Sequence, residues 1–201
     1  MSKHTGKRLY GDGVRVFVVL DFDGVLNTLY NKGTFPKKYF GRLGHFNQAA
    51  IVGPEFELVF PITFSHEMIQ RLNALLGNKK TQLCWLTSWQ EQVLEPAQIM
   101  GLTSKRRPVV INYLQTSDSN QDGKPAGLQR FLADVPDDAK IVWVDDTLHS
   151  GISRRHTEQV DHIMRQMHQQ FLLIGPDDRY GISRAEMTEI ESFVDDSVSI
   201  R

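Results

Sequence analysis

Two aspartates separated by a single residue, Asp21 and Asp23, come directly after five consecutive apolar residues at 16–20. A run that is apolar at every position predicts a strand buried on both faces, as in a parallel sheet covered by helices. Because side chains alternate along a strand, we expect both carboxylates to point to the same side. Gly24 follows at once and permits a tight or left-handed turn. This arrangement of two carboxylates and a glycine is typical of a phosphotransfer site. Solvated Asp and Gly also commonly end strands, however, so this interpretation depends on the rest of the chain.

Hydroxyl, carboxylate and ammonium side chains that could take part in catalysis also lie at the ends of other expected strands and at the start of an expected helix. They are Thr87 and Ser88 after the expected buried strand 82–86, Asp145 and Asp146 after the expected buried strand 141–144, and Lys124 before a helical pattern that Pro125 opens and that continues through Val135. Proline is favoured at the first position of a helix. Open parallel sheets place their chemistry beyond the carboxyl ends of the strands, so we expect these side chains to meet there.

Each of these groups has a task if the substrate is a phosphate ester. Paired carboxylates supply the oxygen ligands that Mg2+ prefers. One aspartate can attack phosphorus and form an aspartyl phosphate, and a second can protonate the leaving oxygen and then activate water. The Thr87 hydroxyl and the Lys124 ammonium can hold phosphate oxygens as charge spreads over them in the transition state.

The four segments, in this order and in these strand and helix contexts, resemble the haloacid dehalogenase (HAD) superfamily of aspartate-nucleophile phosphohydrolases. The resemblance covers about residues 16–146. It implies that Asp21 is the nucleophile and that Asp23 is the general acid/base. It further implies phosphate binding by Thr87 and Lys124, and Mg2+ held by the Asp21 carboxylate, the Asp23 main-chain carbonyl and Asp145, with Asp146 assisting. An Asp at position 23 suits protonation of an alcohol leaving group, which a halide does not need, so phosphate chemistry is favoured over dehalogenation.

Some of these assignments have competitors within the chain. Ser88 adjoins Thr87 and can take the hydroxyl role. Lys105 competes with Lys124, although its Lys-Arg-Arg run is also typical of a solvated loop. Asp146 can cap a helix instead of binding a metal ion.

Length and composition fit one enzyme domain. The chain has 201 residues, 40% of them hydrophobic, enough for one substantial core and short for two. Its net charge of -1 favours no particular class of partner. Cys84 is the only cysteine, which excludes an intramolecular disulfide and a cysteine metal cluster. No apolar stretch approaches the roughly 20 residues of a membrane span, and residues 1–13 are polar without a signal-peptide core. We therefore expect a flexible N-terminal segment, no membrane association and a cytoplasmic location.

Strand and helix patterns alternate along residues 14–201, which predicts a single HAD-like domain. The expected fold is a three-layer α/β/α sandwich, Rossmann-like, with a central parallel sheet of about five strands and right-handed crossovers. Further strands are expected at 110–114 and 171–174. Helices are expected at 65–76, at 89–100 with a break or kink at Pro96, along an apolar stripe from Val160 through Ile163, Met164 and Met167 to Phe171, and after a capping box formed by Ser183 and Glu186.

An insertion at about 28–64 separates the first two motifs and has no long helical pattern. In the superfamily that it resembles, such an insertion forms a flap, and this one is short for a full helical cap domain. It mixes basic residues with aromatic ones, namely Lys32, Lys37, Lys38 and Arg42 beside Tyr30, Phe35, Tyr39, Phe40 and Phe46. Such a mixture either holds phosphates and stacks bases, or packs the flap onto the body with solvated lysines.

The sequence thus predicts a Mg2+-dependent phosphomonoester phosphatase with a relatively open site. Its phosphorylated substrate stays open among a small metabolite, a nucleotide, a phosphoprotein and a nucleic-acid end. A phosphate-accepting signalling module is the alternative from another class, but its nucleophile and acidic pair would come in the reverse order and it would lack an acid/base like Asp23. A non-catalytic binding module is the third, although every catalytic residue type is present. The oligomeric state stays open.

Overall fold

The computed structural model describes residues 13–29, 35–52, 56–113, 123–148 and 154–198, so the segment expected to be flexible at 1–13 lies almost wholly outside the described residues. The core is a five-stranded sheet in the order β5-β4-β1-β6-β7, and every neighbouring pair is parallel. The strands are β1 (Val16–Leu20), β4 (Thr81–Trp85), β5 (Val109–Val110), β6 (Lys140–Val144) and β7 (Gln170–Ile174). The predicted parallel sheet is confirmed.

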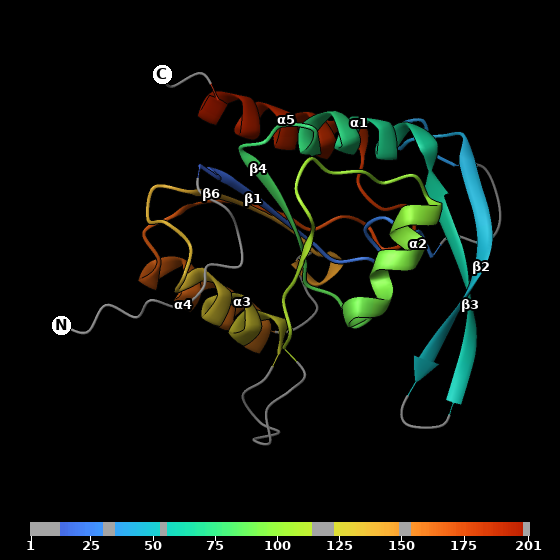
Figure 1. The fold of residues 1–201 in the computed structure, drawn as a ribbon, viewed down its shortest axis with the longest axis horizontal. Helices are drawn as coiled ribbons and strands as arrows, with labels where there is room; N and C mark the ends of the chain where they lie inside the picture. The colour runs from blue at the N-terminus through green and yellow to red at the C-terminus, as the bar shows by residue number, and fades with distance from the viewer. Residues whose placement is uncertain (1–12, 30–34, 53–55, 114–122, 149–153, 199–201) are drawn as a thin grey trace.

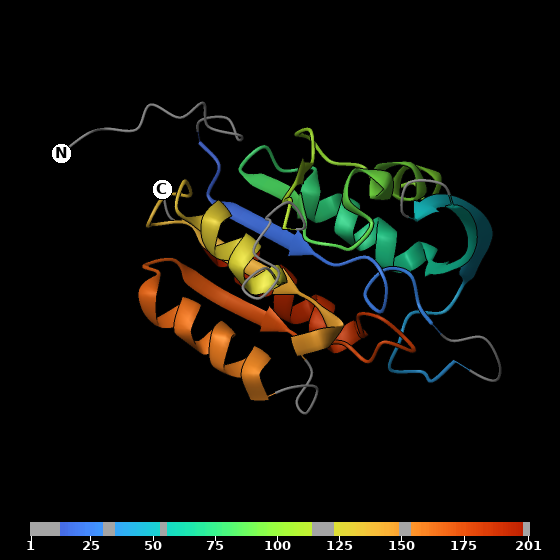
Figure 2. The ribbon, with the colours of Figure 1, turned by 90° about the horizontal axis from the view of Figure 1, so that it is seen from below.

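Helices cover both faces of this sheet. They are α1 (His66–Leu76) and α5 (Arg184–Val198) on one face, and α3 (Lys124–Leu132) and α4 (Arg154–Gln166) on the other, as Figures 1 and 2 show. This arrangement confirms the predicted three-layer α/β/α architecture. No helix in the described parts of the chain has the length and apolar character that crossing a lipid bilayer requires.

The central strand β1 is buried on both faces, as its apolar run predicts. Val16, Val18 and Leu20 pack in the core beneath α1 and α5, whereas Phe17 and Val19 pack with residues of α3 and α4. Hydrogen-bonded neighbours on both edges, β4 and β6, fix the strand in register. Helices on two faces and strands on two edges therefore hold the carboxyl end of β1, and this fixes the position of the residues that follow it.

Helix boundaries differ from the expected ones where proline acts. The sequence pattern predicts a helix from Pro125 to Val135, but the observed helix α3 begins at Lys124 and ends at Leu132. Pro136 disfavours helical geometry at the residue before it, so Val135 lies beyond the helix. The expected helix at 89–100 is a 3-10 helix, Gln90–Val93, followed by α2 (Leu94–Ile99). Pro96 causes no break, because it lies in the first turn of α2, where an N–H is not needed.

The last two expected helices, α4 and α5, both form, but the apolar stripe expected on α4 is only partly buried. Val160 and Ile163 of α4 are buried, but Met164 is exposed, and both Met167 and Phe171 lie beyond the helix. The expected capping box does form at α5. The Ser183 N–H donates to Glu186 Oε2 at 2.7 Å, and the Glu186 N–H donates to Ser183 Oγ at 3.3 Å.

An antiparallel hairpin, unexpected from the sequence, forms within the insertion. Its strands are β2 (Leu43–Val52) and β3 (Phe56–Ser65), and Figure 1 shows it projecting from the body beside α2. The Gln92 side chain fastens it, since Gln92 Oε1 accepts from the Ile51 N–H at 2.6 Å and Gln92 Nε2 donates to the Ile51 carbonyl at 3.1 Å. The distal part of the hairpin exposes apolar side chains, namely Ile51, Val52, Phe56, Leu58 and Val59, at 44–69%.

Aromatic residues of the insertion pack within the protein. Tyr39 is buried and stacks on Tyr180, with ring centroids 4.6 Å apart. Phe40 is buried beneath the Arg184 guanidinium, which lies 4.7 Å from its ring. Lys38 is exposed, with its ammonium 4.9 Å from the Tyr39 ring. The packing interpretation thus holds for Tyr39 and Phe40. Tyr30 and Lys32 lie outside the described residues.

Removing the Gln92 amide should loosen the hairpin. We expect Gln92→Ala to speed amide hydrogen exchange at Ile51 by roughly 2- to 10-fold, because a hydrogen bond contributes about 0.5–1.5 kcal/mol. Gln98→Ala is the matched control, since Gln98 is exposed on α2, the helix that follows. Equal exchange at Ile51 in both variants would contradict the fastening role of Gln92.

Candidate active site

Two buried carboxylates lie side by side at the carboxyl end of the sheet. Asp21 follows β1 and Asp145 follows β6, and they are 6% and 0% exposed. The Asp21 N–H continues the strand pairing by donating to the Val144 carbonyl at 2.9 Å. The parallel register of β1 and β6 thus brings together two aspartates that are distant in the sequence.

Lys124 joins these two carboxylates. Its ammonium donates to Asp21 Oδ2 and, at 2.9 Å, to Asp145 Oδ2. Lys124 is the first residue of α3. Gly127 lets α3 approach the segment after β5 closely, because a Cβ on Gly127 would lie 2.5 Å from the Tyr113 Cβ. The structure therefore brings the expected lysine to the expected nucleophile.

The remaining oxygens of both carboxylates are also oriented. Asp21 Oδ1 accepts from the Phe22 N–H at 2.7 Å. Asp145 Oδ1 accepts from the Thr147 N–H at 3.0 Å and from the Thr147 hydroxyl. Thr147 was not expected to contribute, and its only sequence signal is its position two residues after Asp145.

Asp146, the fourth expected acidic residue, reaches the same place from the end of β6. It is half-buried, and its carboxylate lies against the turn at Gly24. Gly24 has a φ of +71°, and a Cβ there would lie 2.8 Å from Asp146 Cγ and Oδ2. A glycine is therefore required for both the backbone conformation and the approach of Asp146.

The acidic group has the composition of a divalent cation site. One carboxylate oxygen each from Asp21, Asp145 and Asp146 lies within 4.8 Å of the others. Oxygen donors are those that Mg2+ prefers, and three carboxylates beside one lysine leave an excess of negative charge. The Asp23 carboxylate does not belong to this group. Its expected contribution, the main-chain carbonyl, stays a prediction, as does the choice between ligand and capping residue for Asp146.

Electrostatics of the site reflect this excess. Burial raises the pKa of Asp21 to about 6, repulsion from Asp145 adds to the rise, and Lys124 opposes it. Burial and repulsion from Asp145 also raise the pKa of Asp146. Burial lowers the pKa of Lys124, but the charges of Asp145 and Asp21 outweigh it, so the net shift is upward. The Lys124 ammonium therefore stays charged, but its single positive charge does not balance the negative charge of the three carboxylates. A bound cation would reduce this repulsion.

Asp23 has separate partners. Its Oδ1 accepts from Asn27 Nδ2 and its Oδ2 accepts from the Trp89 indole Nε1, each at 2.7 Å. Neither Asn27 nor Trp89 was expected to contribute. Their positions four residues after Asp23 and two after Thr87 are the only signals that the sequence offers.

Thr87 and Ser88 differ in their surroundings. Thr87 is 1% exposed and its hydroxyl accepts from the Trp89 N–H at 3.4 Å, whereas Ser88 is exposed. Which of the two contacts phosphate stays a prediction. Tyr113, which was not singled out, lies close enough to Lys124 for their charges to interact, and burial raises its pKa.

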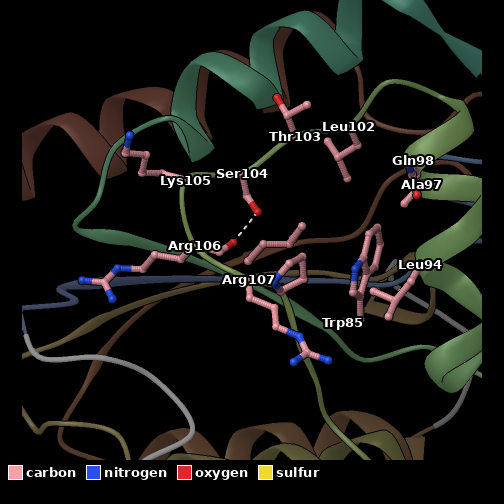
Figure 3. A pocket seen from close by; sticks show the side chains of 12 residues that line it. Trp85, Leu94, Ala97, Gln98, Leu102, Thr103, Ser104, Lys105, Arg106 and Arg107 are labelled. Atoms are coloured by element: carbon pink, nitrogen blue, oxygen red, sulfur yellow. Dashed lines mark hydrogen bonds between the residues drawn. The ribbon is translucent and has the colours of Figure 1, made fainter.

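Lys105, the alternative lysine, lies elsewhere. It borders a cavity of about 360 Å3 between β4, α2 and the loop after α2. Figure 3 shows the Lys105 and Arg106 side chains extending away from Trp85 and Leu94 across this cavity. The Lys105 N–H donates to the carbonyl of Leu76, the last residue of α1, at 2.9 Å. Because α1 ends just before β4 begins, this loop lies toward the amino end of the strands, away from Asp21.

A parallel α/β sheet that delivers acidic residues to its carboxyl edge, beside a lysine from a helix, agrees with the HAD-like fold expected from the sequence. Residues 17–187 match the family described as "HAD domain in Swiss Army Knife RNA repair proteins", and the chain belongs to this family. The predicted superfamily is thereby confirmed. HAD domains typically use Mg2+, and the acidic group is able to bind a metal ion. No curated protein and no solved structure matched the chain.

Protons should compete with Mg2+ at this site. Since the pKa of Asp21 is raised to about 6, the carboxyl is mostly protonated below that pH and mostly ionised above it. We expect Mg2+ affinity to fall as the pH drops below about 6, by up to about tenfold per pH unit, with proton release on binding. Calorimetric titration in buffers of different ionisation enthalpy measures both effects. Affinity that stays constant between about pH 5 and about pH 7.5 would exclude Asp21 as a ligand.

Substitution of Gly24 should damage the same site. Gly24→Ala combines a positive φ with a Cβ at 2.8 Å from the Asp146 carboxylate, so we expect weaker Mg2+ binding and a loss of about 1–2 kcal/mol of stability. Gly101→Ala is the matched control, because its φ is +80° with nothing within 4 Å of the added Cβ. The control should lose stability but keep its Mg2+ affinity. Equal Mg2+ affinities in the two variants would remove Asp146 from the cation site.

Proposed function

We propose that the protein is a Mg2+-dependent phosphomonoester phosphatase that removes the terminal phosphate of a nucleic-acid strand through an aspartyl phosphate on Asp21. The observation that carries this proposal is the contact of the Lys124 ammonium with both Asp21 and Asp145 at the carboxyl end of the sheet. A catalytic carboxylate paired with a half-buried cation suits an anionic substrate, since the cation offsets the repulsion between nucleophile and phosphate.

In the first step, an Asp21 carboxylate oxygen attacks phosphorus and the bond from phosphorus to the leaving oxygen breaks. Asp23, in its protonated form, gives its proton to that oxygen, so an alcohol departs. Lys124 and Thr87 hold the equatorial oxygens of the phosphoryl group while its charge redistributes. Mg2+, when bound by Asp21, Asp145 and Asp146, supplies additional charge neutralisation.

In the second step, the Asp23 carboxylate takes a proton from a water molecule, whose oxygen attacks phosphorus. The bond from phosphorus to the Asp21 oxygen breaks, which releases inorganic phosphate and regenerates the Asp21 carboxylate. Asp23 is left protonated, as the next cycle requires. One residue thus acts as acid and then as base.

Two observations favour a nucleic-acid end as the substrate. The family to which the chain belongs is described by its occurrence in RNA repair proteins. The insertion also carries Lys37 and Lys38, both exposed, and exposed lysines suit the backbone of a polyanionic strand. RNA with a phosphate at its 3′ or 5′ end is therefore the first substrate to test.

The decisive measurement is phosphate release from RNA oligonucleotides phosphorylated at the 3′ or the 5′ end, with Mg2+ and with EDTA. We expect Mg2+-dependent turnover that Asp21→Asn reduces at least about a thousandfold, because the nucleophile is lost. Asp137→Asn is the control, since Asp137 is exposed on the loop between α3 and β6. DNA counterparts and free nucleotides define the substrate class.

Two outcomes would overturn this proposal. Turnover that survives Asp21→Asn would remove the nucleophile. A phosphoryl group retained on the protein without release of phosphate would favour the phosphate-accepting module instead.

A further inference from the structure

Both oxygens of the Asp23 carboxylate are held by neutral donors that the reaction itself does not use. Trp89 Nε1 donates to Oδ2 and Asn27 Nδ2 donates to Oδ1, each at 2.7 Å. Trp89 and Asn27 are 7% and 3% exposed, so neither donor has much access to water. The plane of the carboxylate is therefore fixed by two short hydrogen bonds.

Both donors are in turn supported by strand β3 of the hairpin. Asn27 Oδ1 accepts from the Thr63 N–H at 2.9 Å. The Trp89 ring contacts both Phe22 and Phe60, with centroid distances of 5.3 Å to each. Thr63 and Phe60 both belong to β3. The hairpin thus contacts the Asp23 carboxylate indirectly, through one hydrogen bond and one aromatic contact.

The chemistry of the two donors matters for an acid/base. An indole N–H and the NH2 of an amide donate hydrogen bonds and cannot accept one at that nitrogen. A proton on Asp23 therefore cannot point at Trp89 Nε1 or at Asn27 Nδ2. It must occupy a carboxyl lone pair that these two donors leave open.

We propose that Trp89 and Asn27 are positioning residues that hold Asp23 in the orientation for proton transfer, and that β3 supports them. This inference rests on the proposed function, in which Asp23 protonates the leaving oxygen. It adds that the hairpin contributes to catalysis by fixing the acid/base, beyond any contact with substrate.

The test uses two substrates that need the acid to different degrees. An alkyl phosphate has a poor leaving group that requires a proton, whereas 2,4-dinitrophenyl phosphate has a leaving group that departs as the anion. We expect Trp89→Phe to lower kcat about tenfold or more for the alkyl phosphate and less than about threefold for the aryl phosphate. Asp23→Asn should produce the same split, and adding Trp89→Phe to it should change little.

Trp85→Phe is the matched control. Trp85 is also buried and also contacts Phe22, at a centroid distance of 6.3 Å, but among the described residues its Nε1 has no hydrogen-bond acceptor. This variant should affect both substrates equally. Equal losses on both substrates in Trp89→Phe, or the same split in Trp85→Phe, would overturn the proposal.

A spectroscopic signature separates this inference from the proposed function. The chain has three tryptophans, so three indole N–H resonances can be assigned by substitution in 15N-labelled protein. We expect Asp23→Ala to move the Trp89 resonance and to leave that of Trp85 nearly unchanged. An unmoved Trp89 resonance would overturn the positioning role whether or not the protein hydrolyses phosphate esters. Absence of turnover on every substrate would instead overturn the proposed function.

Discussion

Three carboxylates compete for one ammonium group at the carboxyl end of the sheet. Asp21, Asp145 and Asp146 bring ligand atoms within 4.8 Å of one another, and Lys124 contacts the first two. Like charges that lie together away from water destabilise the folded state. Burial of the apolar core around β1 must offset this destabilisation. The sheet register, the start of α3 and the glycine turn after β1 all act to maintain this arrangement. A rigid scaffold is needed because an unconstrained chain would let the carboxylates separate.

The hairpin gives the insertion a structural role beside any role in substrate choice. Strand β3 contacts both donors that hold Asp23. Gln92 fastens the other strand to the segment that follows Thr87. The hairpin therefore belongs to the same packed unit as the second motif. This coupling helps to hold the Asp23 carboxylate in place, since the main-chain hydrogen bonds of a two-stranded ribbon supply stiffness that a loop would lack.

Much of the fold could be predicted because the buried parallel strands are rich in apolar residues and end abruptly in polar ones. The runs at 82–86 and 141–144 correspond within one residue to β4 and β6, and the polar residues at their ends were placed accordingly. The hairpin was missed because exposed apolar residues, such as Ile51 and Phe56, interrupt the alternation of a half-buried strand. Trp89 was missed because its contact with Asp23 joins two segments that only the folded sheet brings together, and no local pattern encodes it.

The pairing of β1 has a consequence for the order in which the molecule assembles. β1 precedes the other described strands, but its register pairs Val16 with Thr81 of β4 and with Lys140 of β6. Long-range parallel pairing requires large loops to close first, so it is slow compared with local structure. During synthesis Asp21 therefore emerges before β4 and β6, and it reaches its place only after β6 has been made. The acidic group of Asp21, Asp145 and Asp146 is therefore assembled late in folding.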